Sequence, residues 1–156
     1  MQVIKSKKRK KVTPYRKLYL KAERLWKEIA FLRDGRECQV HKLFPQINTT
    51  HDNILQVDHC LTRRDKNFFF DIRNATVVCS TCNMHKKNKF RGIDYAIQKI
   101  VMEREGYEAF GMMMEVHQAG GPNYNFKKIW WIEKVIADLE AYRENYNTCL
   151  KIESES

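Results

Sequence analysis

The 156-residue sequence has no apolar run approaching the roughly 18 residues that a membrane-spanning helix needs. Its first residues, MQVIKSKKRKKVTP, contain neither an apolar core nor a cleavage site, so they do not resemble a secretory signal. Internal repeats are missing, and the sequence has no low-complexity segment beyond one basic run near the N-terminus. These absences argue against a membrane protein and against a secreted one, and we expect a globular chain that stays in the cytoplasm.

Cysteine is sparse and odd in number, with five residues at positions 38, 60, 79, 82 and 149. The odd count and the uneven spacing argue against a disulfide framework. Disulfides are also rare in a reducing cytoplasm, where cysteines serve more often as metal ligands or buried thiols.

Acidic residues are too few to balance the basic ones. The 19 Asp and Glu residues stand against 29 Lys and Arg residues, which leaves a formal net charge of +10. An excess of this size predicts a polyanionic partner, with nucleic acid as the first choice and an anionic membrane surface as the alternative.

Composition divides the chain into three parts. Residues 1–13 form a basic arm built around KSKKRKK, which we expect to be disordered by self-repulsion and suited to tracking phosphates. Residues 14–92 begin with a helix that starts at Thr13-Pro14 and ends at Gly35, and continue into the motif-bearing segment. Residues 93–156 are predicted to be helical, ending in a long amphipathic helix from about Phe126 to Leu150.

The motif-bearing segment predicts the order strand, loop, strand and helix. ILQVDH and ATVVC are the two strands, and Ser80 is the predicted cap of the helix that follows. We therefore expect an α+β fold, in which this small unit is flanked by the N-terminal helix and the helical C-terminal region.

Two half-sites have the ligand type and spacing of structural zinc. Cys38-x-x-His41 and Cys79-x-x-Cys82 each allow two side chains to reach one ion from a tight turn, and together they make a tetrahedral set. The alternative is that Cys38 and His41 are unrelated loop residues and that no metal binds. Cys60 is a further candidate ligand, but it lies beside a histidine that we assign elsewhere.

A second set of residues suits phosphodiester hydrolysis assisted by Mg²⁺ or Mn²⁺. Asp58 and Asn83 offer hard oxygen ligands to such an ion, and His59 has the near-neutral pKa of a general base. Asn74 begins the second strand and is assigned a supporting role, although it can also be a mere turn residue. His85 is the rival of Asn83 as ligand, but lies about 200° away around a helix.

Four cationic residues near this set are candidates for holding the DNA backbone, namely Arg63, Arg64, Lys86 and Lys87. The simpler interpretation is that all four are solvated surface charges.

The segment ILQVDHCLTRR, followed by DIRNATVVCSTCNMHK, resembles the motif of the HNH endonucleases, the ββα-metal nuclease unit with an interleaved zinc site. Asp58-His59, Asn74 and Asn83 match the family pattern in order and spacing, and Asn83 is the variant found in phage endonuclease VII. His41 departs from the pattern, since a second cysteine is usual there. FFFDIRNATVVCSTCNMHKKN is also similar to the phage NinG (Rap) recombination endonucleases.

The resemblance implies a zinc-stabilised ββα-metal core and a DNA endonuclease of phage recombination that acts on branched, Holliday-type DNA in the host cytoplasm. The alternatives are a general nicking or homing-type HNH endonuclease, and a non-catalytic zinc-stabilised DNA-binding protein. Trp130 and Trp131 are adjacent on the last predicted helix, so about 100° of rotation separates them. One can enter the core while the other meets a partner, which suggests a homodimer.

Deleting residues 1–11 removes six Lys and Arg side chains and tests the basic arm. If several of these side chains contact phosphates, affinity for duplex DNA falls. The slope of log affinity against log salt then flattens by about 0.9 for each lost contact. Titrations at several salt concentrations measure this, and an unchanged slope would show that the arm does not touch DNA.

Overall fold

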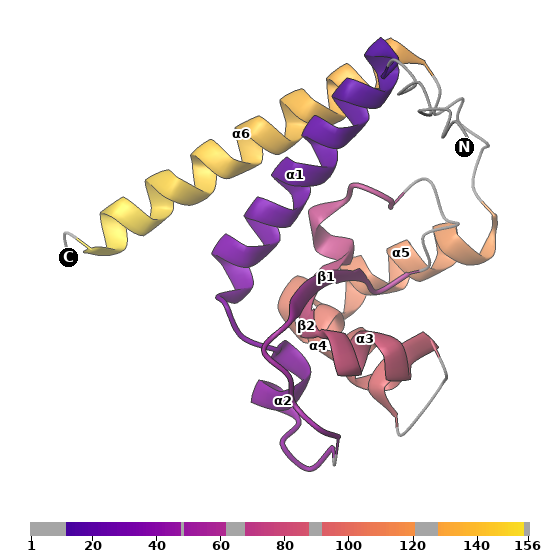
Figure 1. Ribbon diagram of the computed structural model, residues 1–156, viewed down its shortest axis with the longest axis vertical. Helices are drawn as coiled ribbons and strands as arrows, with labels where there is room; N and C mark the ends of the chain where they lie inside the picture. The colour runs from indigo at the N-terminus through magenta and orange to yellow at the C-terminus, as the bar shows by residue number, and fades with distance from the viewer. Residues whose placement is uncertain (1–11, 48, 62–67, 88–91, 121–127, 155–156) are drawn as a thin grey trace, which may run out of the picture.

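The computed structural model describes residues 12–47, 49–61, 68–87, 92–120 and 128–154 (Figure 1). The predicted α+β class is confirmed, with a two-stranded sheet between two layers of helices. The elements follow the order α1 (Pro14–Asp34), α2 (Gln39–Leu43), β1 (Leu55–His59), the 3₁₀ turn η1 (Ile72–Asn74), β2 (Ala75–Cys79), α3 (Ser80–Lys87), α4 (Ile93–Glu105), α5 (Tyr107–Gln118) and α6 (Ile129–Ser154).

Helix α1 has the ends that its sequence predicts. The Thr13 hydroxyl accepts a hydrogen bond from the Arg16 amide at 3.2 Å, and Pro14 occupies the first helical position. Gly35 ends the helix with a φ of 74°, a conformation that a side chain would strain. One face of the helix is buried, and its members recur at helical spacing: Ala22, Leu25, Trp26, Ile29 and Ala30.

Strands β1 and β2 pair antiparallel, in a register that runs from Leu55 opposite Cys79 to His59 opposite Ala75. Every residue of β2 is buried, because helices cover both faces of the sheet. Val77 packs on the side of α1, and Val78 packs on the opposite side.

The two faces of the sheet carry separate hydrophobic cores. The first lies between the sheet, α1 and α6, and includes Ala22, Leu25, Trp26, Ile29, Val57, Val77, Ile132, Ile136 and Leu139. The second lies between the sheet, α2 and α4, and includes Cys38, Val40, Val78, Cys79, Cys82, Ile93, Ile97 and Val101. Each core draws residues from both sides of the boundary expected at position 92.

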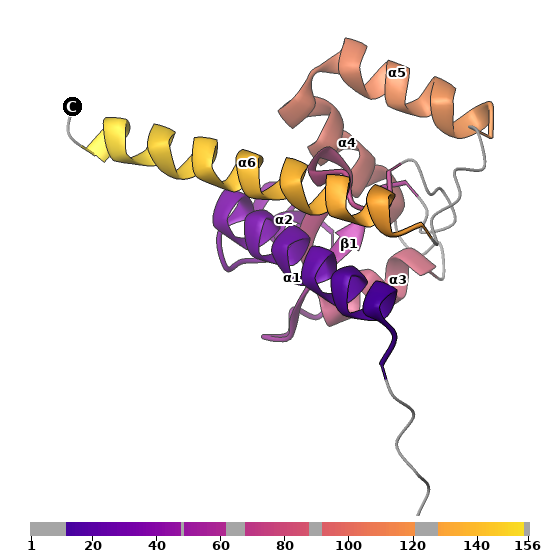
Figure 2. The same ribbon diagram turned by 90° about the horizontal axis from the view of Figure 1, so that it is seen from above.

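Helices α1 and α6 run side by side in the same direction (Figures 1 and 2). Lys21 of α1 pairs with Glu140, near the middle of α6, at 2.8 Å. Further along, Arg143 pairs with Glu28 at 3.3 Å. Within the described ranges no helix combines the length and the apolarity that crossing a membrane would need.

The outer edge of β2, which has no strand beside it, is occupied by side chains from the end of α1. Asp34 accepts a hydrogen bond from the Val77 amide at 3.0 Å, and Arg33 donates to the Ala75 carbonyl at 2.7 Å. Arg33 also donates to the Ile72 carbonyl at 2.7 Å, and Arg104 of α4 approaches Asp34 at 3.5 Å. These contacts join α1, η1, β2 and α4 in one partly buried polar network.

Helix α3 is capped by a residue that the sequence did not suggest. Ser80 was expected to be the cap, but the helix already begins at Ser80, and Asp52 takes that role. One carboxylate oxygen of Asp52 accepts hydrogen bonds from the Thr81 amide and the Ser80 hydroxyl, both at 2.8 Å. Hydrogen bonds from Thr81 and then Ser80 hold the pKa of Asp52 below its ordinary value.

Replacing Asp52 by Asn is expected to lower the melting temperature at pH 7, because the charged cap and one acceptor oxygen are lost. The pKa of Asp52 is lower in the folded protein than in the unfolded chain. The parent therefore has the full stabilisation above the ordinary aspartate pKa of about 4, and loses it as the pH falls below that value. The difference in melting temperature between parent and Asp52→Asn should therefore shrink below about pH 4.

Asp138→Asn is the matched control, because Asp138 pairs with Lys134 in an exposed position on α6. Calorimetry from pH 2 to pH 7 measures all three proteins. If Asp52→Asn and the parent had the same melting temperature at every pH, the capping role would be refuted.

Candidate functional site

The two predicted half-sites converge on one point. Cys38 precedes α2 and His41 lies within it, while Cys79 ends β2 and Cys82 lies in the first turn of α3. The ligand atoms of these four residues all lie within 4.8 Å of one another, and three of the four residues are buried. The prediction that the four residues form one cluster capable of holding a metal is confirmed.

The dimensions of this Cys/His cluster fit zinc. Tetrahedral zinc with its usual bond lengths places two sulfurs about 3.8 Å apart, and a sulfur and a nitrogen about 3.5 Å apart. The sulfurs of Cys38 and Cys82 lie 3.9 Å apart. His41 Nδ1 lies 3.3, 3.8 and 3.6 Å from the sulfurs of Cys38, Cys79 and Cys82. A metal such as zinc can therefore be held without rearranging the side chains.

Thr49 orients the histidine of the cluster. His41 Nε2 lies 2.9 Å from the Thr49 hydroxyl and 3.2 Å from its carbonyl oxygen, which can only accept a hydrogen bond. The Nε2 atom therefore carries the proton, and Nδ1 turns a lone pair toward the sulfurs. Thr49 lies in a polar loop, QINTTHDN, where no sequence signal marked it.

A hydrogen bond between the sulfurs of Cys38 and Cys82 shifts the pKa values of the two thiols in opposite directions. The hydrogen bond with Cys82 lowers the pKa of Cys38 below its ordinary value, although burial opposes this shift. The same hydrogen bond, together with burial, raises the pKa of Cys82. Sharing a proton in this way makes one sulfur of the pair easier to ionise than an isolated thiol, and the thiolate is the form that binds a metal.

Cys60 does not join the cluster. It lies in the second core, and burial raises its pKa to about 12, so it remains a protonated thiol.

The second predicted set is divided between the two faces of β1. Gln56 and Asp58 face α3, whereas His59 faces α1, because successive side chains of a strand point to opposite sides. The Asn83 amide donates to Gln56 Oε1 at 2.5 Å, and the Lys86 ammonium lies 2.6 Å from Asp58. Asn83 and Asp58 thus belong to one interface between helix and strand.

His59 lies in an aromatic environment. Its ring stacks on Trp26 with the centroids 4.4 Å apart and also contacts Phe69 at 5.0 Å. Its Nε2 atom lies 2.8 Å from the Phe69 carbonyl oxygen and must therefore donate. In the neutral ring, Nδ1 is then the basic nitrogen.

Asn74 holds the chain around this histidine. It is fully buried, and its side-chain oxygen accepts from the Leu61 amide at 2.6 Å. Its amide donates to the Phe68 carbonyl at 2.9 Å, which ties both ends of the intervening segment to the start of β2. Through its side chain, Asn74 therefore links Leu61 and Phe68.

The predicted DNA contacts are only partly within the described residues. Arg63, Arg64 and the side chain of Lys87 lie outside them. Lys86 does not project into solvent, because it is bound to Asp58 and to the main chain at the end of β1. His85 is half-buried on α3, two residues beyond Asn83.

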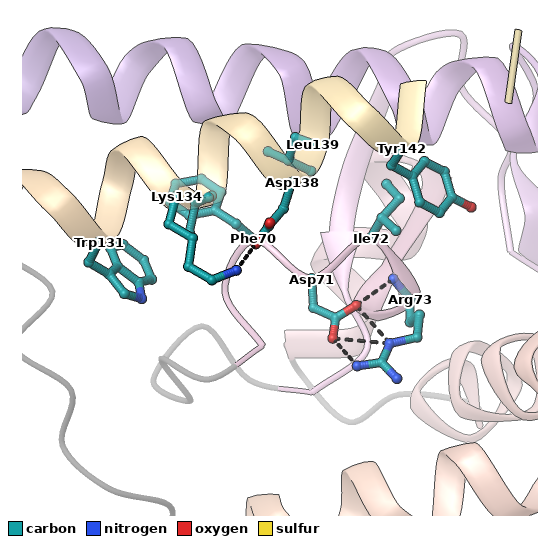
Figure 3. A pocket seen from close by; sticks show the side chains of 10 residues that line it. Phe70, Asp71, Ile72, Arg73, Trp131, Lys134, Asp138, Leu139 and Tyr142 are labelled. Atoms are coloured by element: carbon teal, nitrogen blue, oxygen red, sulfur yellow. Dashed lines mark hydrogen bonds and ion pairs between the residues drawn. The ribbon is translucent and has the colours of Figure 1, made fainter. Parts of the chain in front are cut away.

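A hollow of about 460 Å³ lies between η1 and α6, away from the Cys/His cluster (Figure 3). Trp131 and Leu139 line it from α6, and Ile72 lines it from η1. Arg73 lies at the hollow with its guanidinium bonded to Asp71, so its charge is already paired. The predicted catalytic residues are not among those that line this hollow.

Comparison with known proteins adds no relative. No family model matches the sequence, and neither a curated protein nor a solved structure matches the chain.

Cys79→Ser should lose the metal and much of the stability. We expect about one zinc per chain in the parent by elemental analysis, and less in the variant. A structural zinc contributes on the order of 10 kcal/mol, so the melting temperature should fall by more than about 10 °C.

Cys149→Ser is the control, because Cys149 is exposed and lies outside the cluster. It should keep the zinc content and the melting temperature of the parent. A folded parent that contains no zinc would refute the metal centre.

Proposed function

We propose that this protein is a metal-dependent DNA endonuclease with a ββα-metal core. The observation that carries the proposal is the unit formed by β1, β2 and α3, which the Cys/His cluster fastens at the corner between β2 and α3. Asn83 follows the cluster residue Cys82 directly, and α3 presents it to the same face of β1 as Asp58. The likeness to the HNH motif agrees with this order of elements.

The donor set suits a hard divalent cation. Asp58 offers a carboxylate, and the buried side-chain oxygen of Asn83 accepts no hydrogen bond from the described residues. Mg²⁺ and Mn²⁺ favour such oxygen ligands and supply electrostatic stabilisation to a phosphate under attack. Asp58 and Asn83 are the residues that would hold the ion.

His59 is the proposed general base. Its Nδ1 atom would take a proton from the water that attacks phosphorus, as the bond from phosphorus to the leaving oxygen breaks. The Phe69 carbonyl fixes the tautomer that leaves Nδ1 basic. Because His59 and Asp58 face opposite sides of β1, the phosphate has to lie at the end of the strand, where both can reach it.

The net charge of +10 supports nucleic acid as the substrate. Branched, Holliday-type DNA rests on the resemblance to the NinG endonucleases, and a general nicking or homing-type activity is the alternative within the nuclease class.

A non-catalytic, zinc-stabilised DNA-binding protein is the second candidate function. Two observations favour it. His59 is only 4% exposed between Trp26 and Phe69, and the Asp58 carboxylate is already paired with Lys86. A cleavage assay separates the two candidates.

A homodimer through α6 stays a prediction. Trp130 is 58% exposed, while Trp131 packs against Phe70 with the ring centroids 6.2 Å apart. Trp130 is therefore the tryptophan available to a partner, and a two-fold dimer would present two sites to the two strands of a junction.

His59→Ala is expected to keep DNA binding and to lose cleavage by about 10²–10⁴-fold, because the base is removed while the cations remain. The assay compares plasmid and four-way junction DNA with Mg²⁺ and with EDTA. His117→Ala, on α5, is the matched histidine control, and circular dichroism checks that each variant is folded. Comparable DNA cleavage by His59→Ala and the parent would refute the assignment of His59 as the general base.

A further inference from the structure

Lys86 occupies the carboxylate that the proposed divalent cation needs. Its ammonium lies 2.6 Å from Asp58 Oδ2 and 3.4 Å from the Cys60 carbonyl oxygen, and it also donates to the His59 carbonyl. The side chains of Lys86 and Asp58 are 14% and 9% exposed. Three oxygen acceptors therefore surround one buried ammonium at the end of β1.

This pair differs from the other lysine pairs among the described residues. Lys134 and Asp138, for example, form a pair on α6 whose members are both mostly exposed. An exposed pair exchanges readily with water and ions. A mostly buried pair is held more firmly, because separating it would leave two charges that are neither paired nor fully hydrated. The Asp58 carboxylate is thus neutralised by the chain itself.

The lysine and the second candidate ligand lie on the same face of α3. Asn83 precedes Lys86 by three residues, which is one turn of helix, and both side chains reach β1. The side-chain oxygen of Asn83 is buried without a hydrogen-bond donor among the described residues. A divalent cation that uses Asp58 and Asn83 must therefore compete with the positively charged Lys86 ammonium for the Asp58 carboxylate.

We propose that Lys86 is a positioning residue that couples metal loading to DNA binding. Without DNA, its ammonium holds Asp58 and keeps the affinity for divalent cations low. A backbone phosphate at the end of β1 offers the ammonium another anion, and the released carboxylate then accepts the metal. The inference rests on the proposed function. The coupling is reciprocal, so the metal must also tighten DNA binding.

Mn²⁺ binding, followed by electron paramagnetic resonance on the full-length zinc-loaded protein, tests this without any cleavage. Lys86→Met should bind Mn²⁺ at least about tenfold more tightly than the parent in the absence of DNA, a change within the usual range of site coupling. Duplex DNA should tighten Mn²⁺ binding by a similar factor in the parent and leave Lys86→Met unchanged. Asp58→Asn with the same DNA measures the Mn²⁺ that DNA itself holds.

Two controls separate charge from shape and from general electrostatics. Lys86→Arg keeps the positive charge beside Asp58, so its Mn²⁺ affinity should stay near that of the parent. Lys134→Met removes the same charge from an exposed pair and should also behave like the parent. Equal Mn²⁺ affinity in Lys86→Met and the parent would overturn the proposal.

Should Lys86→Met fail to fold, the parent alone still decides, because Mn²⁺ affinity that does not respond to DNA overturns the coupling. The proposed function fails separately. DNA-dependent Mn²⁺ binding that the parent shows and Lys86→Met lacks, without cleavage by any variant, retains the role of Lys86 and removes the nuclease. DNA cleavage together with Mn²⁺ binding that does not depend on DNA retains the nuclease and removes the role of Lys86.

Discussion

The structure depends on the hydrogen bonds that the main-chain groups at the outer edge of β2 form with side chains. A two-stranded sheet leaves unpaired amides and carbonyls on both of its edges, and buried groups of this kind are costly unless they are bonded. Because β2 is entirely buried, water cannot serve its outer edge. Asp34 and Arg33 supply the missing donors and acceptors to Val77 and Ala75, much as a third strand would. The end of α1 is thereby fixed against the sheet.

The remaining contacts of the unit follow from that attachment. With α1 in place, Trp26 stacks on His59 and donates a hydrogen bond to the Asp71 carbonyl at 3.1 Å, so the helix supports both the strand and the segment before η1. On the other face, the Cys/His cluster and the Asp52 cap hold the beginning of α3. Each face of the sheet is therefore held by a different kind of interaction.

Local signals in the sequence were enough for α1, the two strands and the metal ligands, but they did not indicate the short helix α2 or the turn η1. Thr13-Pro14 and Gly35 marked α1, and the spacing of Cys79 and Cys82 marked half of the cluster, because in each case neighbouring residues carry the information. The contacts between distant residues were not predictable in this way. The Asp52 cap joins residues about thirty positions apart, and Lys86 reaches Asp58 across 28 positions.

For the candidate catalytic residues, too, the sequence indicated the residues themselves but not their distant contacts. Asp58, His59, Asn74 and Asn83 were selected by their order and by their likeness to a motif, and adjacency in the strand already implied that Asp58 and His59 face opposite ways. The side chains that contact these residues in the structure could not be predicted from the sequence. Nothing in the sequence indicated that Trp26 would stack on His59, or which of the two adjacent tryptophans on α6 would face inward.

The parallel packing of α1 and α6 has a consequence for biosynthesis. The second core and the metal ligands are all contributed by residues up to Val101, so this half can assemble while the ribosome is still adding the rest of the chain. The first core needs Ile132, Ile136 and Leu139 from the last helix. Until that helix emerges, the part of the first core that α6 covers stays exposed, and it is there that a nascent chain would need a chaperone.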